Sequence, residues 1–243
     1  MILWPAKRYL SAKKTNTLCQ KKCDIFLAKA GKYIQDDFYS FSTINSLYYD
    51  TPDFEIANNC ISKPAYKEKL RMRCYKSPGL CDNVFLELKK KYRSITYKRR
   101  IELPLKNALQ MLNNNPESDQ TQIAKEILYM FTRYKNLAPK MFIRYDRLAF
   151  KGVDDPKLRI TIDFNLGYRS TDLDITNTSD YRPLLDENLR LMEIKAVHCY
   201  PIWLVTLLDE LKLYPTSYSK YINSCLAASK SQTLDYKGGA QSA

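Results

Sequence analysis

The sequence predicts an α+β fold in which antiparallel strands close into a β-barrel and helices pack on the outside. Several segments alternate apolar and polar residues at a spacing of two, which is typical of strands with one buried face. The few helical segments must then cover the apolar faces from outside, so the polar faces point inward. Because those polar faces are mainly basic, the predicted interior is water-filled and fits a chain of phosphates with a divalent cation.

The elements follow in chain order from periodicity and turn residues. A helix is predicted over 15–30, and strands from about 40 to 92 and on to 103, broken by Thr51-Pro52 and by Ser77-Pro78-Gly79. Helices at 105–112 and 119–134 precede strands that restart at Pro139, a strand at 189–197, and two helices after Pro201 and Ser217. We expect a single domain over 1–228 and a disordered tail over 229–243.

One strand carries the strongest chemical signal. In YKEKLRMRCY, residues 66–75, Lys67, Lys69, Arg71 and Arg73 stand two residues apart and share one strand face. Four like charges in this position repel one another, and this repulsion costs stability unless a polyanion lies across them. The pattern therefore predicts a polyanion-binding site.

The other strands repeat this pattern of charged faces. Their polar sides hold Glu87, Lys89 and Lys91, then Lys98 and Arg100, then Arg144, then Arg159 and Asp163, and finally Glu193 and Lys195. A strand that simply meets water would carry more Ser, Thr, Gln and paired charges on that side. The basic residues favour an anionic ligand spread over several strands.

Composition narrows the class of protein. The formal charge of +13 and a pI near 9.3 favour anionic ligands, and the excess charge sits in strands rather than in a tail. Seven cysteines without the spacing of a disulfide module indicate a reducing compartment. No signal-peptide core and no run of about 20 apolar residues is present, so we expect a cytoplasmic chain.

Several common site types are excluded. The chain contains neither GxxxxGK[ST] nor GxGxxG, which excludes a P-loop and a dinucleotide-binding turn. His198 has no spaced partner, and we interpret it as a surface or packing residue. Cys19 and Cys23 lack a second pair at metal spacing, which argues against zinc.

Eight stretches in order resemble the VTC domain of polyphosphate polymerases, in a stand-alone bacterial form. They are LYYDTPDFE, KPAYKEKLRMR, VFLELKKK, YKRRI, IRYDRLAF, LRITIDFNLGYR, LMEIK and LYPTSYSKY. The resemblance runs from about Leu47 to Tyr221. That domain belongs to the triphosphate tunnel metalloenzymes of the CYTH-like superfamily.

The resemblance implies a tunnel of about eight antiparallel strands. In it, Mn²⁺ or Mg²⁺ and basic side chains hold ATP while the terminal phosphate of a growing polyphosphate chain attacks the γ-phosphorus. The family's phosphate-binding positions fall on Arg71, Arg73, Lys89, Lys98, Arg144, Arg159 and Lys220, and its metal-binding carboxylate falls on Glu193. Glu87 or Asp163 is expected to assist at the metal, and Arg8, Lys69 and Lys195 to assist in binding ATP. ATP and polyphosphate are the expected partners, without nucleic acid; a membrane partner is not encoded in this chain.

The N-terminal segment departs from the family pattern. Tunnel enzymes commonly open with ExExK, whereas this chain has Trp4 and Ala6 at the glutamate positions and Arg8-Tyr9 in place of Lys-Tyr. Missing glutamates count against a two-metal, hydrolase-type site.

The sequence is also compatible with other functions. The chain could be a tunnel hydrolase of triphosphates, or a non-catalytic binder of polyanions or nucleic acid that lacks a recognisable nucleic-acid motif. Single residues also have structural interpretations: Glu87 and Asp163 could pair with neighbouring basic residues, and Glu193 with Lys195.

Overall fold

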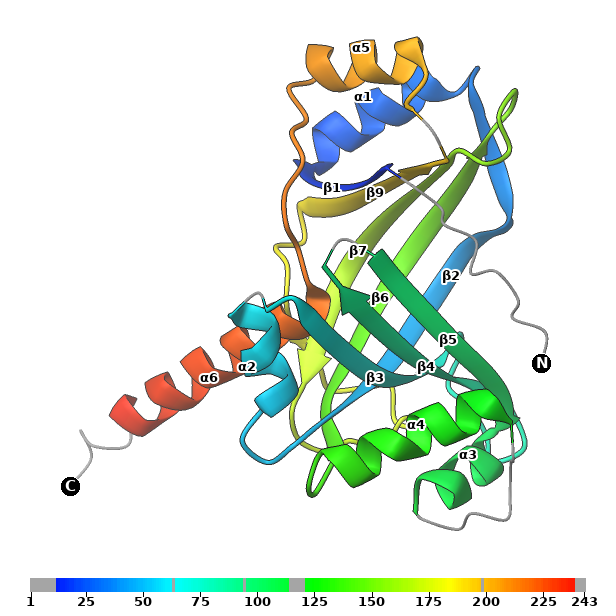
Figure 1. Cartoon of the computed structure of the whole chain (residues 1–243). Helices are drawn as coiled ribbons and strands as arrows, with labels where there is room; N and C mark the ends of the chain where they lie inside the picture. The colour runs from blue at the N-terminus through cyan, green and yellow to red at the C-terminus, as the bar shows by residue number, and fades with distance from the viewer. Residues whose placement is uncertain (1–11, 63, 94, 114–120, 198, 239–243) are drawn as a thin grey trace. The chain divides into compact units, whose positions relative to one another are not determined.

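The computed structural model describes residues 12–62, 64–93, 95–113, 121–197 and 199–238 (Figure 1). In chain order the elements are β1 (Ala12–Cys19), α1 (Gln20–Ala30), β2 (Ile34–Asp50), α2 (Glu55–Ile61), β3 (Tyr66–Cys74), β4 (Asn83–Tyr92), β5 (Ile95–Pro104), α3 (Leu105–Leu112), α4 (Gln122–Arg133), β6 (Ala138–Gly152), β7 (Arg159–Arg169), β8 (Arg182–Pro183), β9 (Leu189–Ala196), α5 (Ile202–Glu210) and α6 (Lys220–Gly238). The α+β class predicted from the sequence is confirmed.

The strands form one large sheet. Their hydrogen-bonded order is β1-β9-β7-β6-β2-β3-β4-β5, with β8 beside β7. Among the described residues no strand pairing joins the outer strands β1 and β5, so the sheet is not closed. Closure would require hydrogen bonds along β5, which is exposed over most of its length. The predicted closed barrel is therefore not confirmed.

Most predicted elements are present, with three differences. Residues 12–19 form a strand paired with β9 along its whole length, where a helix was expected to begin at Thr15. Helix α2 follows the turn at Thr51-Pro52, where only a break between strands was expected. Helix α6 continues to Gly238, inside the stretch predicted as a disordered tail.

The chain divides into two compact units. The first unit comprises residues 1–42, 146–165 and 185–218, and the second comprises 43–145, 166–184 and 219–243. The single domain over 1–228 stays a prediction. No helix within the described part of the chain is both long enough and apolar enough to cross a membrane.

The second unit packs two helices on one side of β3, β4 and β5 (Figure 1). The alternate residues Leu70, Met72, Leu86 and Leu88 are fully buried in a core that also contains Met111 and Ile127 of α3 and α4. Helix α4 begins after Thr121, whose side chain accepts a hydrogen bond from the Ala124 amide at 3.2 Å. Because side chains alternate along a strand, the charged residues between these buried apolar residues point to the opposite side of the sheet.

The first unit has a separate apolar core. Helices α1 and α5 lie against each other (Figure 1), and α1 also packs on β1 and β9. Phe26, Ile160, Met192, Ile194 and Leu204 are fully buried in this core. The rings of Tyr33 and Trp203 stack with centroids 4.5 Å apart. Apolar residues at alternate positions of β7 and β9 are thereby buried, as their sequence pattern predicts, but the polar Thr161 and Asp163 of β7 are buried as well.

Candidate functional site: a basic face on β3, β4 and β5

The charged residues of β3, β4 and β5 meet in rows across the sheet. Antiparallel register places four rows on one side: Lys67, Lys91 and Thr96; Lys69, Lys89 and Lys98; Arg71, Glu87 and Arg100; and Arg73, Phe85 and Glu102. We call this surface the basic face. It carries eight Lys or Arg residues and two Glu residues, and one row consists of three directly opposed lysines. Such opposed like charges destabilise a sheet by themselves, which favours an anionic ligand here.

Glu87 is the central counter-ion of the basic face. Its side chain is 2% exposed and lies 2.6 Å from Arg71 Nη2 and 2.6 Å from Lys98 Nζ. Arg73 and Arg100 are also paired with it, at 3.8 and 3.5 Å. Burial alone would raise the pKa of Glu87, but Arg71, Arg73 and Lys98 together lower it to about 2. One carboxylate is thus shared by four cations, and a surplus of positive charge remains.

Tyrosine hydroxyls hold the two arginines of β3. Arg71 Nη1 donates to Tyr48 Oη at 2.8 Å, and Arg73 Nη2 donates to Tyr145 Oη at 3.2 Å. Burial raises the pKa of Tyr48, but the charges of Arg71, Arg73 and Lys69 outweigh burial and lower the pKa to about 8. The lowered pKa of Tyr48 is therefore a consequence of the same excess of positive charge.

The first turn of α6 joins the basic face. Lys69 Nζ donates to Ser219 Oγ at 3.0 Å and lies 5.7 Å from the centroid of the Tyr221 ring. Lys220 Nζ lies 4.4 Å from the centroid of the Tyr145 ring, whose hydroxyl binds Arg73. The structure thus connects Lys220, a residue of the C-terminal helix, with the predicted β3 arginines.

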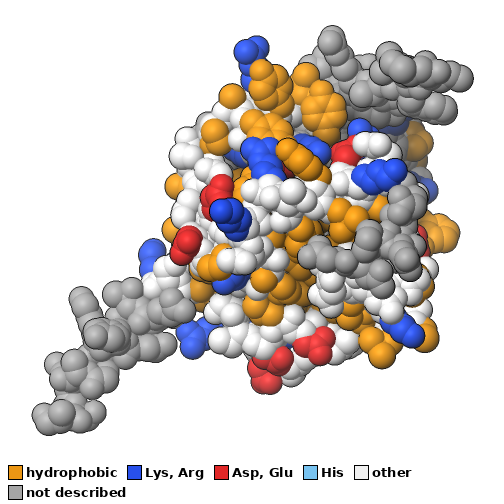
Figure 2. Space-filling view, turned by 60° about the horizontal axis from the view of Figure 1, so that its bottom comes forward, with side chains coloured by type: hydrophobic (Ala, Val, Ile, Leu, Met, Phe, Trp, Pro, Cys, Tyr) orange, Lys and Arg blue, Asp and Glu red, His pale blue; other side chains and the backbone are white. Residues whose placement is uncertain are grey.

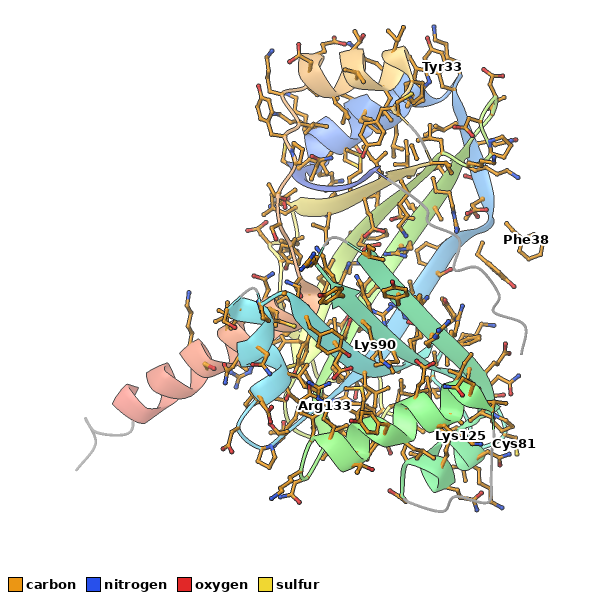
Figure 3. The ribbon with its side chains drawn as sticks, in the orientation of Figure 1. Tyr33, Phe38, Cys81, Lys90, Lys125 and Arg133 are labelled. Carbon is orange, nitrogen blue, oxygen red and sulfur yellow. The ribbon has the colours of Figure 1, made fainter. Side chains whose placement is uncertain are left out.

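Lys90 marks the other side of β4. It lies next to Lys89 in the sequence, yet its Nζ donates to Glu126 of α4 at 3.2 Å (Figure 3). Arg99 of β5 contacts the same glutamate at 3.4 Å. Neighbouring basic residues therefore divide between the basic face and the helix-covered side, as alternation predicts.

Arg144 is held by a different part of the second unit. Its Nη1 donates to the Thr178 carbonyl at 2.9 Å, and its guanidinium lies 5.3 Å from the centroid of the Tyr181 ring. The structure therefore shows Arg144 bound to the segment that follows β7. Arg8 lies outside the described residues.

The remaining predicted site residues belong to the first unit. Arg159 pairs with Asp37 at 2.5 Å, and Lys195 pairs with Glu193 at 2.8 Å. Both Asp163 carboxylate oxygens accept hydrogen bonds from Arg147, at 2.6 and 2.8 Å. Glu87, Asp163 and Glu193 thus all form the ion pairs that were the structural alternative to metal binding.

The three predicted carboxylates differ in how well they suit metal binding. No group of three or more His, Cys, Asp or Glu side chains that could hold a metal ion is found in the described residues. Glu87 and Asp163 are poor candidates, because their oxygens already bind Lys and Arg. Glu193 also pairs with a lysine, but it fits better, because it lies opposite Thr161 in the β7–β9 register and Thr161 Oγ1 is buried without a hydrogen-bond partner among the described atoms. A carboxylate and a hydroxyl are hard oxygen donors, and Mg²⁺ takes its other ligands from phosphates and water.

Other surface features carry less chemistry. A hollow of about 550 Å³ in the second unit is lined by Thr51, Asp53, Arg133 and Lys135 among others, where acidic and basic groups are mixed. Large hydrophobic side chains such as Phe38, 86% exposed, project into solvent (Figure 3). Figure 2 shows such groups scattered among Lys and Arg side chains. None of these features matches the unbalanced charge of the basic face.

Sequence reasoning missed the residues that support the cations. The sequence alone predicts no role in the site for Tyr48, Tyr145, Tyr221 or Asp50. Tyr48 and Asp50 occur in LYYDTPDFE and Tyr221 ends LYPTSYSKY, so the family motifs already contained them. Arg100 lies on the polar side of its strand, but no role is predicted for it from the sequence.

Comparison with known proteins supports this assignment of motifs. The sequence profile of the VTC domain matches residues 7–229. The chain belongs to the VTC domain family. This confirms the resemblance indicated by the eight motifs. No curated protein matches the chain in sequence.

The fold was also compared with those of solved structures. A "putative adenylate cyclase" from Bacillus halodurans matches with a TM-score of 0.53 and 8% identity, covering 85% of this chain and 92% of that one. The PH1819 protein from Pyrococcus horikoshii OT3 matches with a TM-score of 0.47 and 11% identity, covering 90% and 99%. At 8% identity, the similarity to the Bacillus protein concerns the fold alone.

Proposed function

We propose that this VTC domain is an ATP-dependent polyphosphate polymerase that transfers the γ-phosphate of ATP to a growing polyphosphate chain. The observation that carries the proposal is the basic face, where eight Lys or Arg residues lie beside two glutamates and four of these cations share Glu87. Both the donor and the acceptor of this reaction are polyanions. Catalysis then consists mainly of charge neutralisation and in-line positioning, which Lys and Arg can supply without a side-chain nucleophile.

The side chains have different roles in this proposal. Arg71 and Arg73 grip phosphate oxygens, since a guanidinium stays charged and binds in bidentate fashion. Lys69, Lys89, Lys98 and Lys220 act as point charges beside them. From the family resemblance we also assign contacts with the phosphates to Arg144, Arg159, Lys195 and Arg8. We place the reaction in the cytoplasm, because its donor is ATP and all seven cysteines are free.

Mn²⁺ or Mg²⁺ is the proposed cofactor, held by Glu193 and supplying charge neutralisation for the phosphates. Glu193→Gln keeps the shape of the side chain and removes its charge. We expect activity to fall at least tenfold and to return in part at raised Mn²⁺ concentration, because a weakened site fills at higher metal concentration. Activity is measured against metal concentration. If the variant instead loses thermal stability and keeps its specific activity, Glu193 serves only its ion pair with Lys195.

Product analysis tests the proposed reaction. Purified protein is incubated with ATP and Mn²⁺ or Mg²⁺, and the products are separated on a gel. The proposal predicts ADP and a long polymer that resists nuclease and is degraded by phosphatase. Orthophosphate as the sole product would indicate a triphosphate hydrolase. Tight polyanion binding without turnover would indicate a non-catalytic binding domain.

A further inference from the structure

The DTP turn and the start of α6 meet at a buried carboxylate. Asp50 ends β2, has no solvent exposure, and accepts the Tyr221 hydroxyl at 2.5 Å across 171 positions of sequence. Its oxygens also accept backbone amides from Thr51 at 2.7 Å and from Ile56 and Ala57 at 2.9 Å. Four donors therefore fix Asp50 in one orientation. A buried carboxylate bound in this way is rigid and can anchor another element.

Tyr221 connects the anchored Asp50 to the basic face. Its ring stacks on Tyr48 with centroids 4.7 Å apart and planes 10° from parallel, and Tyr48 accepts a hydrogen bond from Arg71 at 2.8 Å. In the two positions just before Tyr221, Ser219 accepts a hydrogen bond from Lys69 and Lys220 lies over the Tyr145 ring. Fixing the Tyr221 hydroxyl thus fixes the turn that carries Lys220.

We infer that Asp50 and Tyr221 are positioning residues, which hold the first turn of α6 so that Lys220, Lys69 and Arg71 meet a polyanion in one geometry. This inference rests on the proposed function of the basic face. It assigns a role to the DTP turn, which from sequence was only a strand ending. Neither residue touches the phosphates. They act through the cations that they orient.

The test compares two tyrosines of the same unit. Tyr221→Phe removes one buried hydroxyl and keeps the ring stack. Tyr134→Phe removes another hydroxyl, which donates to the buried Glu68 at a distance of 3.1 Å and does not lie on the basic face. Binding of tripolyphosphate is measured by titration calorimetry, and stability by thermal denaturation. We expect both variants to lose stability. Tyr221→Phe should also weaken binding at least threefold, while Tyr134→Phe binds within 1.5-fold, a threshold of about 0.2 kcal/mol.

A double substitution separates positioning from general loosening. If Tyr221 acts through Lys220, Tyr221→Phe should weaken binding less in a Lys220→Ala background than in wild type. Binding by Tyr221→Phe within 1.5-fold of wild type, with Lys89→Ala still weakened, would overturn the positioning role and leave the proposed function standing. Unchanged binding in Lys89→Ala, Lys220→Ala and Tyr221→Phe alike would overturn the basic face itself.

Discussion

Arg73→Ala is expected to lower polymer formation from ATP at least tenfold, a loss of about 1.4 kcal/mol or more in transition-state stabilisation. The guanidinium lies on the basic face with hydrogen bonds to Tyr145 and Ser46 that fix its orientation. A cation from solution cannot substitute for a guanidinium that the protein holds in a fixed position, so its removal should lower turnover. The turnover number at saturating ATP is the measurement.

The control is Arg99→Ala, an arginine on the opposite side of β5 that pairs with Glu126 at 3.4 Å. Its turnover should stay within twofold of wild type. The Arg73 side chain is 8% exposed, so some stability is also lost, by about 1–3 kcal/mol. Both variants are therefore assayed below their melting temperatures. Wild-type turnover in a folded Arg73→Ala protein would refute its role.

Glu87→Gln is expected to destabilise the protein by roughly 3 kcal/mol at pH 7. The pKa of Glu87 falls from 4.5 to about 2 on folding, and such a lowered pKa stabilises the folded state above pH 4.5. As the pH falls below 4.5, the carboxyl becomes protonated first in the unfolded chain and the contribution shrinks; about half of it is gone near pH 3. The difference in unfolding free energy between wild type and variant, measured by urea denaturation at several pH values, should follow this curve.

Tripolyphosphate should rescue the same variant. Without Glu87 the four surrounding cations lack their counter-ion, so a bound polyanion should raise the melting temperature more in Glu87→Gln than in wild type. Glu126→Gln serves as the control, because Glu126 pairs with Lys90 and Arg99 on the helix-covered side. A pH-independent loss of stability, or an equal rescue of both variants, would show that Glu87 is not the counter-ion of a binding site.

The direction of the charged side chains could be predicted from the sequence. Alternation in β3 and β4 separates Lys69 and Arg71 from Leu70 and Met72, because a buried apolar face leaves only one side for the charges. The helices after β5 and after β9 could also be predicted from their apolar spacing and from Pro201. These features depend on neighbours in sequence alone.

Partners that depend on register or on distant segments could not be predicted. Whether Glu87 binds a metal or four cations depends on the alignment of β3, β4 and β5, which the intervening turns set. Amides in the first turn of α2 donate to the side chains of Asp50 and Thr51, and Asp50 is itself fixed by Tyr221 far along the chain. Strand β1 depends on its pairing with β9. Each of these features requires contacts that no local pattern contains.

Lys89 and Lys90 offer the most direct test of the binding face, because they are adjacent in sequence and lie on opposite sides of β4. Titration with tripolyphosphate should show that Lys89→Ala weakens binding by about 1.5–3 kcal/mol, as expected for a hydrogen bond to a charged group. Lys90→Ala should stay within about 0.5 kcal/mol of wild type. Equal losses would indicate a diffuse electrostatic patch, and a larger loss at Lys90 would contradict the assignment of the basic face as the phosphate-binding side of the sheet.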